Sequence, residues 1–143
     1  VNARGVAICR MNDAVLGAMA MAVPEKMNAA GCGHANIFLA GGVDGNGQRF
    51  TGALGGPLRS GTGARMNKDG IDVADHDLSN VFHIPLEVTE KEFPVRYRRM
   101  QLWTDSGGAG KRRGGLGFSA DVEWLEGDAV LSVRGELHKF HPW

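Results

Sequence analysis

Residues 105–124 read DSGGAGKRRGGLGFSADVEW, a glycine-rich loop that runs directly into a strand pattern. From Phe118 to Trp124, apolar residues alternate with polar ones, which is the two-residue period of a strand with one apolar face. The turn residues Glu126-Gly127-Asp128 and a further apolar alternation follow. Residues 118–134 are therefore predicted to form a β-hairpin.

Working outward, further strands are expected on the N-terminal side. Residues 35–40 and 48–54 flank Asp44-Gly45-Asn46-Gly47, whose glycines readily supply the positive φ angles of a tight reversal, and this pattern predicts another hairpin. After Pro94 the apolar residues again alternate as in a strand. Residues 55–82 have no sustained period, and such a long connection is expected to be functional or covered by another chain.

One helix is expected near the start of the chain. Its apolar residues recur at the spacing of a single helix face, which predicts an amphipathic helix over about residues 13–23. Asn12 or Asp13 would cap it, and Pro24 would stop it. The same segment has some features of a secretory signal, but its apolar residues are better explained by the helix. The fold class is therefore predicted to be mixed α/β (α+β), strand-rich, with one N-terminal amphipathic helix and long glycine-rich loops.

The composition is that of one globular domain without a global electrostatic partner. The chain has 143 residues, and 16 Lys and Arg balance 16 Asp and Glu, which disfavours duplex DNA and anionic membranes as partners. Glycine takes 22 positions while apolar residues reach 43%, so the chain is not a disordered low-complexity sequence. No apolar run approaches the ~18 residues needed to span a bilayer. Two cysteines alone favour a reduced, cytoplasmic setting.

The glycine-rich loop allows two interpretations. Its backbone N–H groups could converge on an anion, with Lys111, Arg112 and Arg113 completing a phosphate or carboxylate site. It lacks the spacing of a Walker loop and of a dinucleotide-binding fingerprint. The preferred alternative is a tight, backbone-packed connection between strands. The basic residues are expected to pair with internal acids or with a partner subunit rather than with nucleic acid.

Two other clusters contain reactive residue types. Asp72, Asp75, His76 and Asp77 could bind a metal, but they match no defined metal motif and are more simply explained as a solvated acidic loop. Cys32 stands beside the Gly33-His34 pair, yet side chains so close in sequence rarely point at each other, which disfavours a nucleophile and base. Neither cluster supports a catalytic or metal-binding residue in this chain.

The order of these motifs resembles the C-terminal part of the hydantoinase B family, which includes the second half of 5-oxoprolinase and subunits of acetone and acetophenone carboxylases. The longest matching block is Asp105-Ser106-Gly107-Gly108-Ala109-Gly110 followed by Arg113-Gly114-Gly115-Leu116-Gly117. Shorter matches are the helix from Asp13 to Pro24, Gly61-Thr62-Gly63-Ala64-Arg65, Lys68-Asp69-Gly70, Asn80, Ile84-Pro85-Leu86-Glu87, Glu90 and Phe93-Pro94. Residues 1–143 thus resemble a single C-terminal region of such a protein, which implies a fragment or a split subunit.

The resemblance implies membership of an ATP-dependent complex. A hydantoinase A-type subunit would use ATP and Mg²⁺ to phosphorylate an oxygen of the substrate, and the B-type subunit would complete hydrolysis of a cyclic amide. The alternatives are ketone carboxylation by the same kind of complex and a non-catalytic interaction module within it. A divalent metal (Zn, Mn or Fe) is implied in the N-terminal part of the family, which these residues do not include, so the chain is not expected to be active alone or to bind a cofactor itself.

The resemblance also implies a supporting role for particular residues. The expected partners are the A-type subunit, the remainder of the B-type subunit and a small-molecule substrate. Three polar residues would order the site, and the glycine-rich loop would form a wall of the site or a subunit contact. The residues so implied are Asp69, Asn80, Glu87, Asp105, Ser106, Gly107, Gly108, Gly110, Arg113, Gly114 and Gly115.

Overall fold

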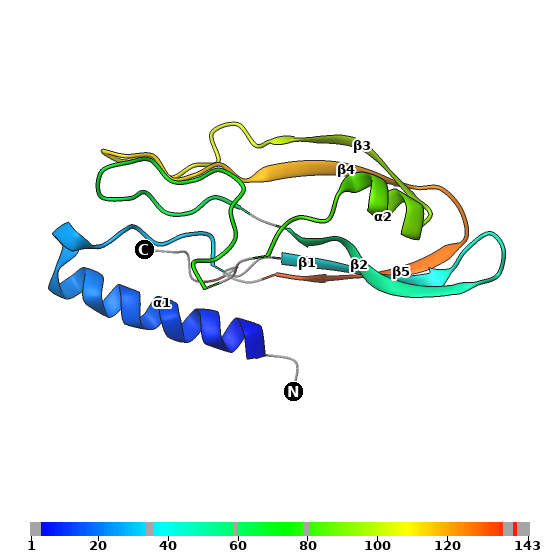
Figure 1. The fold of residues 1–143 in the computed structure, drawn as a ribbon, viewed down its shortest axis with the longest axis horizontal. Helices are drawn as coiled ribbons and strands as arrows, with labels where there is room; N and C mark the ends of the chain where they lie inside the picture. The colour runs from blue at the N-terminus through cyan, green and yellow to red at the C-terminus, as the bar shows by residue number, and fades with distance from the viewer. Residues whose placement is uncertain (1–3, 34–35, 59, 79–80, 136–138, 140–143) are drawn as a thin grey trace.

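The strands lie in two stacked layers, one of three strands and one of two (Figure 1). The computed structural model describes residues 4–33, 36–58, 60–78, 81–135 and 139. The larger sheet has the order β2-β1-β5 and the smaller one pairs β3 with β4, and every pairing is antiparallel. The strands are β1 (Asn36–Val43), β2 (Arg49–Leu58), β3 (Val95–Leu102), β4 (Phe118–Trp124) and β5 (Asp128–Arg134). The mixed, strand-rich fold predicted from the sequence is confirmed.

The hairpin predicted around residues 44–47 is confirmed as β1 and β2. Asp44 Oδ1 accepts hydrogen bonds from the backbone N–H groups of Asn46 and Gln48, at 2.9 and 2.8 Å. Gly47 has φ +82°, in the region that favours glycine. The turn therefore forms from its own side chain and backbone, which explains why a local pattern is enough to predict it.

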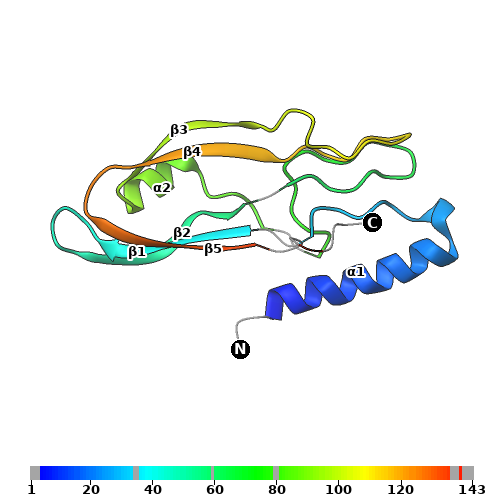
Figure 2. The same cartoon turned by 180° about the vertical axis from the view of Figure 1, so that it is seen from behind.

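The hairpin predicted over residues 118–134 is wrong. β4 pairs with β3, whereas β5 pairs with β1, so the connection between them crosses from one layer to the other (Figures 1 and 2). Gly127, with φ +74°, bends the chain, and its carbonyl accepts the indole N–H of Trp124 at 3.2 Å. Trp124 packs against the core, so the chain leaves β4 toward the other sheet rather than folding back on it.

The N-terminal helix is longer than predicted. It is α1, Arg4–Ala22, followed after Val23 by the short 3-10 helix η1, Pro24–Lys26. Asn12 and Asp13 therefore lie inside the helix and do not cap it, because the residues before them, from Arg4 on, are helical as well. The predicted stop before Pro24 is correct.

A second, short helix was not predicted. This helix, α2 (Leu86–Glu92), follows Pro85 and carries Glu87 in its first turn and Lys91 in its last. Those are the usual signs of a helix start and end, so the signal was present in the sequence. α2 contacts β2 of one layer and β3 of the other, and it lies toward the end of the molecule that holds the turn between β1 and β2 (Figure 1).

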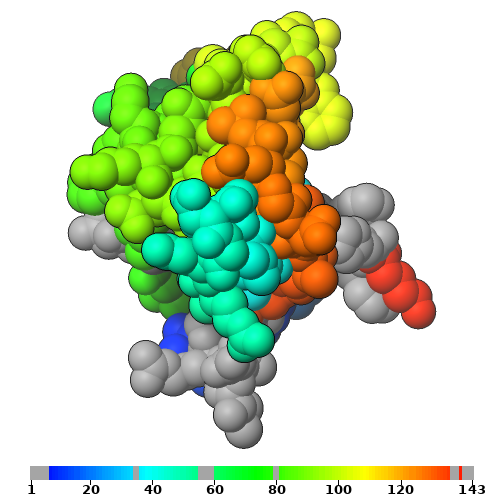
Figure 3. All heavy atoms as spheres, turned by 90° about the vertical axis from the view of Figure 1, so that its right-hand side faces the viewer, coloured from blue at the N-terminus to red at the C-terminus, as the bar shows by residue number. Residues whose placement is uncertain are grey.

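The core lies at that same end. Ala40, Leu54 and Val95 are buried, and the rings of Phe50, Phe93 and Trp124 pack around them. Seen from this end, the turn between β1 and β2 lies between α2 and the connection from β4 to β5 (Figure 3). Because so few side chains are buried, apolar packing holds only part of the molecule. No helix in the described part of the chain is both long and apolar enough to cross a membrane.

Candidate functional site

A cavity of about 1150 Å³ opens between the two sheets and the glycine-rich loops, and it reaches the core at Leu54 and Trp124. Its apolar side comes from the facing strands, with Phe38 and Leu54 on one sheet and Phe118 and Trp124 on the other. Its other side comes from the glycine-rich loops. A space of this volume, lined by aromatic rings and backbone, is typical of a binding site.

Several predicted site residues line this cavity. The loop between β3 and β4 contributes Ser106, Gly108, Gly110, Gly114 and Gly115. Among the described lining residues, Arg112 alone carries a full charge at neutral pH. The cavity therefore suits a neutral or anionic molecule, or uncharged polypeptide, better than a cation.

Three segments meet through their backbones at the wall of the cavity that the loops form. A Cβ on Gly61 would overlap the carbonyl of Gly115, and a Cβ on Gly115 would overlap that of Ile71. Gly63 and Gly70 are equally confined by backbone atoms. We call these four residues, Gly61, Gly63, Gly70 and Gly115, the glycine seam.

Backbone hydrogen bonds hold the glycine seam together. The N–H of Gly115 donates to the carbonyl of Thr62 at 2.9 Å, and the N–H of Gly70 donates to the carbonyl of Arg113 at 2.7 Å. On the other side, Ala29 donates to Ala64 at 2.9 Å. These bonds confirm the preferred interpretation of the loop as a tight, backbone-packed connection for its second half.

Two aspartates fix the loop from the neighbouring segment. Asp69 Oδ1 accepts the backbone N–H of Arg113 at 2.9 Å. Asp72 Oδ1 accepts the backbone N–H of Leu116 at 2.7 Å and lies 3.5 Å from the guanidinium of Arg113. Nothing in the sequence marked Asp72 for this role, because its partner is 44 residues away.

The start of the loop is ordered by a serine. The hydroxyl of Ser106 donates to the carbonyl of Trp103 at 2.7 Å and accepts the N–H of Gly117 at 2.8 Å. Asp105 has φ +59°, an uncommon conformation for a residue with a side chain, and Gly107 lies against the carbonyl of Gly114. These bonds join the two ends of the loop.

Five of the predicted residues that the structure describes do not line the cavity: Asp69, Glu87, Asp105, Gly107 and Arg113. Glu87 is exposed in the first turn of α2 and does not line it. Asn80 lies outside the described residues, as do His34 and His138. The contact roles predicted for the site residues remain predictions.

The acidic segment from Asp72 to Asp77 is more ordered than the solvated loop expected from the sequence. His76 is buried, its Nδ1 accepts the N–H of Leu78 at 3.2 Å, and its Nε2 lies 2.9 Å from Asp13 Oδ1 on α1. This partner set places the proton on Nε2. Asp13 also pairs with Arg10 at 2.6 Å, so the cluster docks α1 on the loops. Among the described residues, no group of three His, Cys, Asp or Glu is arranged to hold a metal ion.

Cys32 is not activated as a nucleophile. Burial is the largest effect and raises the pKa of its thiol. A backbone hydrogen bond at Ser60 lowers this pKa by less, and the carboxylates of Asp75 and Asp13 raise it. Its Sγ–H donates to the carbonyl of Gly33 at 3.6 Å. A thiol in negative, desolvated surroundings stays protonated and unreactive.

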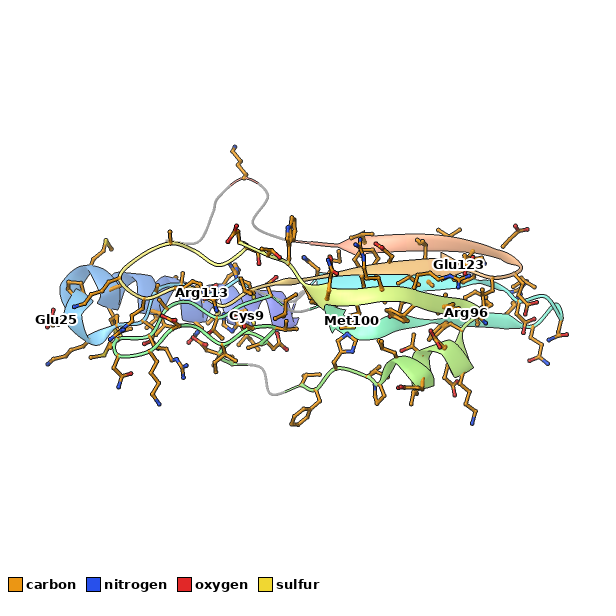
Figure 4. All side chains as sticks on the ribbon, turned by 90° about the horizontal axis from the view of Figure 1, so that it is seen from above. Cys9, Glu25, Arg96, Met100, Arg113 and Glu123 are labelled. Atoms are coloured by element: carbon orange, nitrogen blue, oxygen red, sulfur yellow. The ribbon has the colours of Figure 1, made fainter. Side chains whose placement is uncertain are left out.

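Part of the basic cluster is paired within the chain. Arg98 pairs with Glu123 and Arg99 with Asp121, both across the small sheet. Figure 4 shows Arg113 on the loop half of the molecule, with Arg96 and Glu123 on the sheet half. Arg96 and Arg113 therefore lie on different halves of the molecule, and the pairs of Arg98 and Arg99 agree with the expectation of internal pairing.

The whole length of the chain matches one protein family. Residues 1–143 match the family described as Hydantoinase B/oxoprolinase. The chain belongs to this family. The resemblance inferred from the sequence motifs is thereby confirmed.

Named relatives agree with this family. A protein of Pseudomonas sp. (strain NS671) assigned as the B component of a D-/L-hydantoinase is 31% identical over 92% of this chain, and the match covers 21% of that protein. The beta component of the caprolactamase of Pseudomonas jessenii is 32% identical over 87% of this chain and 22% of its own length.

A solved structure is also similar. Nucleotide-free acetone carboxylase matches with a TM-score of 0.57 and 26% identity over 75% of this chain and 14% of the carboxylase chain. The 143-residue chain spans about a fifth of the length of the two Pseudomonas relatives.

Proposed function

We propose that this chain is the cavity-forming region of a B-type subunit in an ATP-dependent amidohydrolase complex that opens cyclic amides. The family membership of residues 1–143 carries the proposal, together with relatives named as components of a hydantoinase and of a caprolactamase. Hydantoins and caprolactam are both cyclic amides. An A-type subunit, the remainder of the B-type subunit and the substrate are the proposed partners, in the cytoplasm.

The geometry supports a positioning role for this region. The cavity has glycine backbone on one side and aromatic rings on the other, and its described lining includes no carboxylate or imidazole. Cys32 and Tyr97 line it, but burial raises the pKa of both side chains, which leaves neither suited to accept a proton near neutral pH. This region would hold and enclose a substrate, while groups elsewhere in the complex do the proton transfer.

ATP would supply the driving force of the reaction. Phosphorylation of the amide oxygen turns a poor electrophile into a good one, and a divalent metal would supply a nucleophilic water near neutral pH. The proposed metal would belong to the rest of the subunit; among the described residues of this chain, no group of three His, Cys, Asp or Glu is arranged to hold one. The residues of this chain would enclose and orient the substrate during that step.

Carboxylation is the second candidate, and one observation favours it. The similar solved structure is an acetone carboxylase. The cavity between the two sheets does not distinguish the two reactions, because a ketone and a lactam are both neutral molecules with one carbonyl oxygen. A non-catalytic interaction module is the third candidate, suggested by the small core.

A coupled assay separates these candidates. The native polypeptide is purified from its source with its associated chains, and phosphate release from ATP is measured with hydantoin, caprolactam or 5-oxoproline, and with acetone plus bicarbonate. Phosphate release stimulated by a cyclic amide, with a ring-opened product, supports the hydrolase. Stimulation by acetone only when bicarbonate is present supports the carboxylase. Turnover by the 143-residue chain alone, free of metal, would contradict the proposal that this region only positions the substrate while other groups of the complex carry out the chemistry.

A further inference from the structure

Helix α1 differs from a typical surface helix in that its polar side chains face the body of the chain and its exposed side chains are apolar. Between residues 7 and 22 its charged and amide side chains are Arg10, Asn12 and Asp13, and all three lie on the half-buried inner side. Arg10 and Asp13 pair with each other, and Asp13 also contacts His76 in the loop below. A surface helix usually does the reverse and buries its apolar face.

The exposed face of α1 is entirely apolar over the same span. Met11 is 68% exposed and Val15 59%, and Met19 is exposed as well. The remaining exposed residues of this span are Ala7, Ile8, Ala14, Ala18, Met21 and Ala22. The apolar face predicted from the sequence is therefore real, but it points away from the described body of the chain.

The surface shape of this face is complementary to that of another helix. Met11, Val15 and Met19 follow one another at four-residue steps and form a ridge of larger side chains. Ala14, Ala18 and Ala22 follow at the same steps and form a parallel groove. Ridges and grooves along four-residue rows are the features by which two helices interlock. At 19 residues, α1 is about 28 Å long, enough for such a contact.

We propose that this face of α1 is the docking surface for a helix with an uncharged, apolar face that belongs to the same B-type subunit, outside these 143 residues. The proposal rests on the proposed function. Two observations choose the occupant. The curated relatives described above are about five times longer than the matched region, so most of such a subunit is available to cover it. The face also has no charge, so a charged partner segment would lose its hydration without gaining an ion pair.

The described contacts of α1 support an external partner. Among the helices and strands, α1 has close neighbours only in η1, and it touches the body through loops. In Figures 1 and 2 it runs beside the two sheets along one end of the molecule rather than across either layer. The inner side thus combines the polar contacts of Asp13 with the buried Cys9 and the half-buried Leu16, whereas the outer side is apolar and exposed.

Methionine oxidation tests the proposal, because Met11 and Met19 lie on the face and Met66 is 59% exposed on a loop away from it. The native polypeptide is treated with dilute peroxide, natively and in urea, and sulfoxide formation is followed by mass spectrometry. We expect Met11 and Met19 to react at least about tenfold more slowly in the native state, and Met66 within about twofold of its rate in urea. Equal native rates for Met11 and Met66 would overturn the proposal.

Other occupants give different results. Protection that grows with protomer concentration would assign the face to a second copy, and protection that needs an added A-type subunit would assign it to that chain; either result overturns the proposal. A native polypeptide no longer than 143 residues also overturns it. A matched pair of variants adds a second measurement: Met11→Glu should lower the melting temperature of the native polypeptide by about 5 °C or more, and Met66→Glu by about 1 °C or less.

The outcome is independent of the assay for the proposed function. ATP-coupled turnover by a polypeptide whose Met11 is not protected from oxidation would contradict the docking proposal alone. Protection of Met11 without ATP-coupled turnover would sink the proposed reaction alone.

Discussion

Two sets of glycines in this chain serve different purposes. At the glycine seam, each missing side chain makes room for a neighbouring backbone carbonyl. At the tip of the loop between β3 and β4, a Cβ on Gly108 would meet nothing, and one on Gly110 would lie 3.2 Å from the carbonyl of Arg112. The seam glycines are thus explained within the chain, whereas the tip glycines are not. We infer from this difference that the seam glycines stabilise the fold, whereas the tip glycines contact a molecule in the cavity or a partner chain.

The largest expected effect comes from filling the seam. Gly115→Ala would push a methyl group into the carbonyl of Ile71, and we expect the free energy of unfolding to fall by about 3 kcal/mol or more. Gly108→Ala is the matched control, because Gly108 does not have a positive φ and has open space around it. Its effect should stay within about 0.5 kcal/mol. Urea unfolding of the native polypeptide measures both, and equal effects would remove the distinction between seam and tip.

The next effect separates the two aspartates that hold the loop. Asp72→Ala leaves the half-buried N–H of Leu116 without its partner, and we expect a loss of about 1–3 kcal/mol. Asp69→Ala removes a similar bond to Arg113 at an exposed position, where water replaces the lost partner, so the loss should be about 1 kcal/mol or less. The same unfolding measurement compares them. A larger effect for Asp69 would mean that the second half of the loop is not held as described.

A pH-dependent effect is expected from the thiol beside the seam. The backbone N–H of Cys32 donates to Gly61 at 3.2 Å, and burial raises the pKa of the thiol above its ordinary value of 9.0. Because the folded pKa exceeds the unfolded one, the stabilisation is complete below 9.0 and is lost as the pH rises through the folded pKa. Unfolding should therefore become easier above pH 9.0, and less so in Cys32→Ser. Rapid alkylation of native Cys32 at neutral pH would contradict this description.

The features that the sequence predicts correctly are local. The hairpin at residues 44–47 is fixed by Asp44 and Gly47 themselves, and the end of α1 is fixed by Pro24. The seam joins residues more than forty positions apart, as between Gly61 and Gly115, and no periodicity carries that information. The family resemblance nevertheless identifies the loops that meet there, since it compares whole motifs rather than local periods.

The errors have local causes as well. The turn at Gly127 looks the same in sequence whether the chain folds back in one sheet or crosses to the other. For α1, the helical period is correct, but a period does not say which face is buried. Asp13 resembles a cap because its preference for helix starts is strong, and its contact with His76, 63 residues away, has no sequence signal.

The smallest expected effect on stability distinguishes two neighbouring arginines. The carbonyl of Arg113 accepts the N–H of Gly70 in the seam, whereas its side chain only approaches Asp72 at 3.5 Å in a half-exposed pair. Arg113→Ala should therefore cost about 1 kcal/mol or less. Arg112 lines the cavity, and Arg112→Ala should leave the free energy of unfolding unchanged within about 0.5 kcal/mol. If the tip serves a contact, Arg112→Ala should instead raise the KM of the assembled complex for its substrate, or weaken assembly, while Arg113→Ala changes neither. Steady-state kinetics and sedimentation of the complex test this, and an effect of both variants on stability alone would assign the whole loop to the fold.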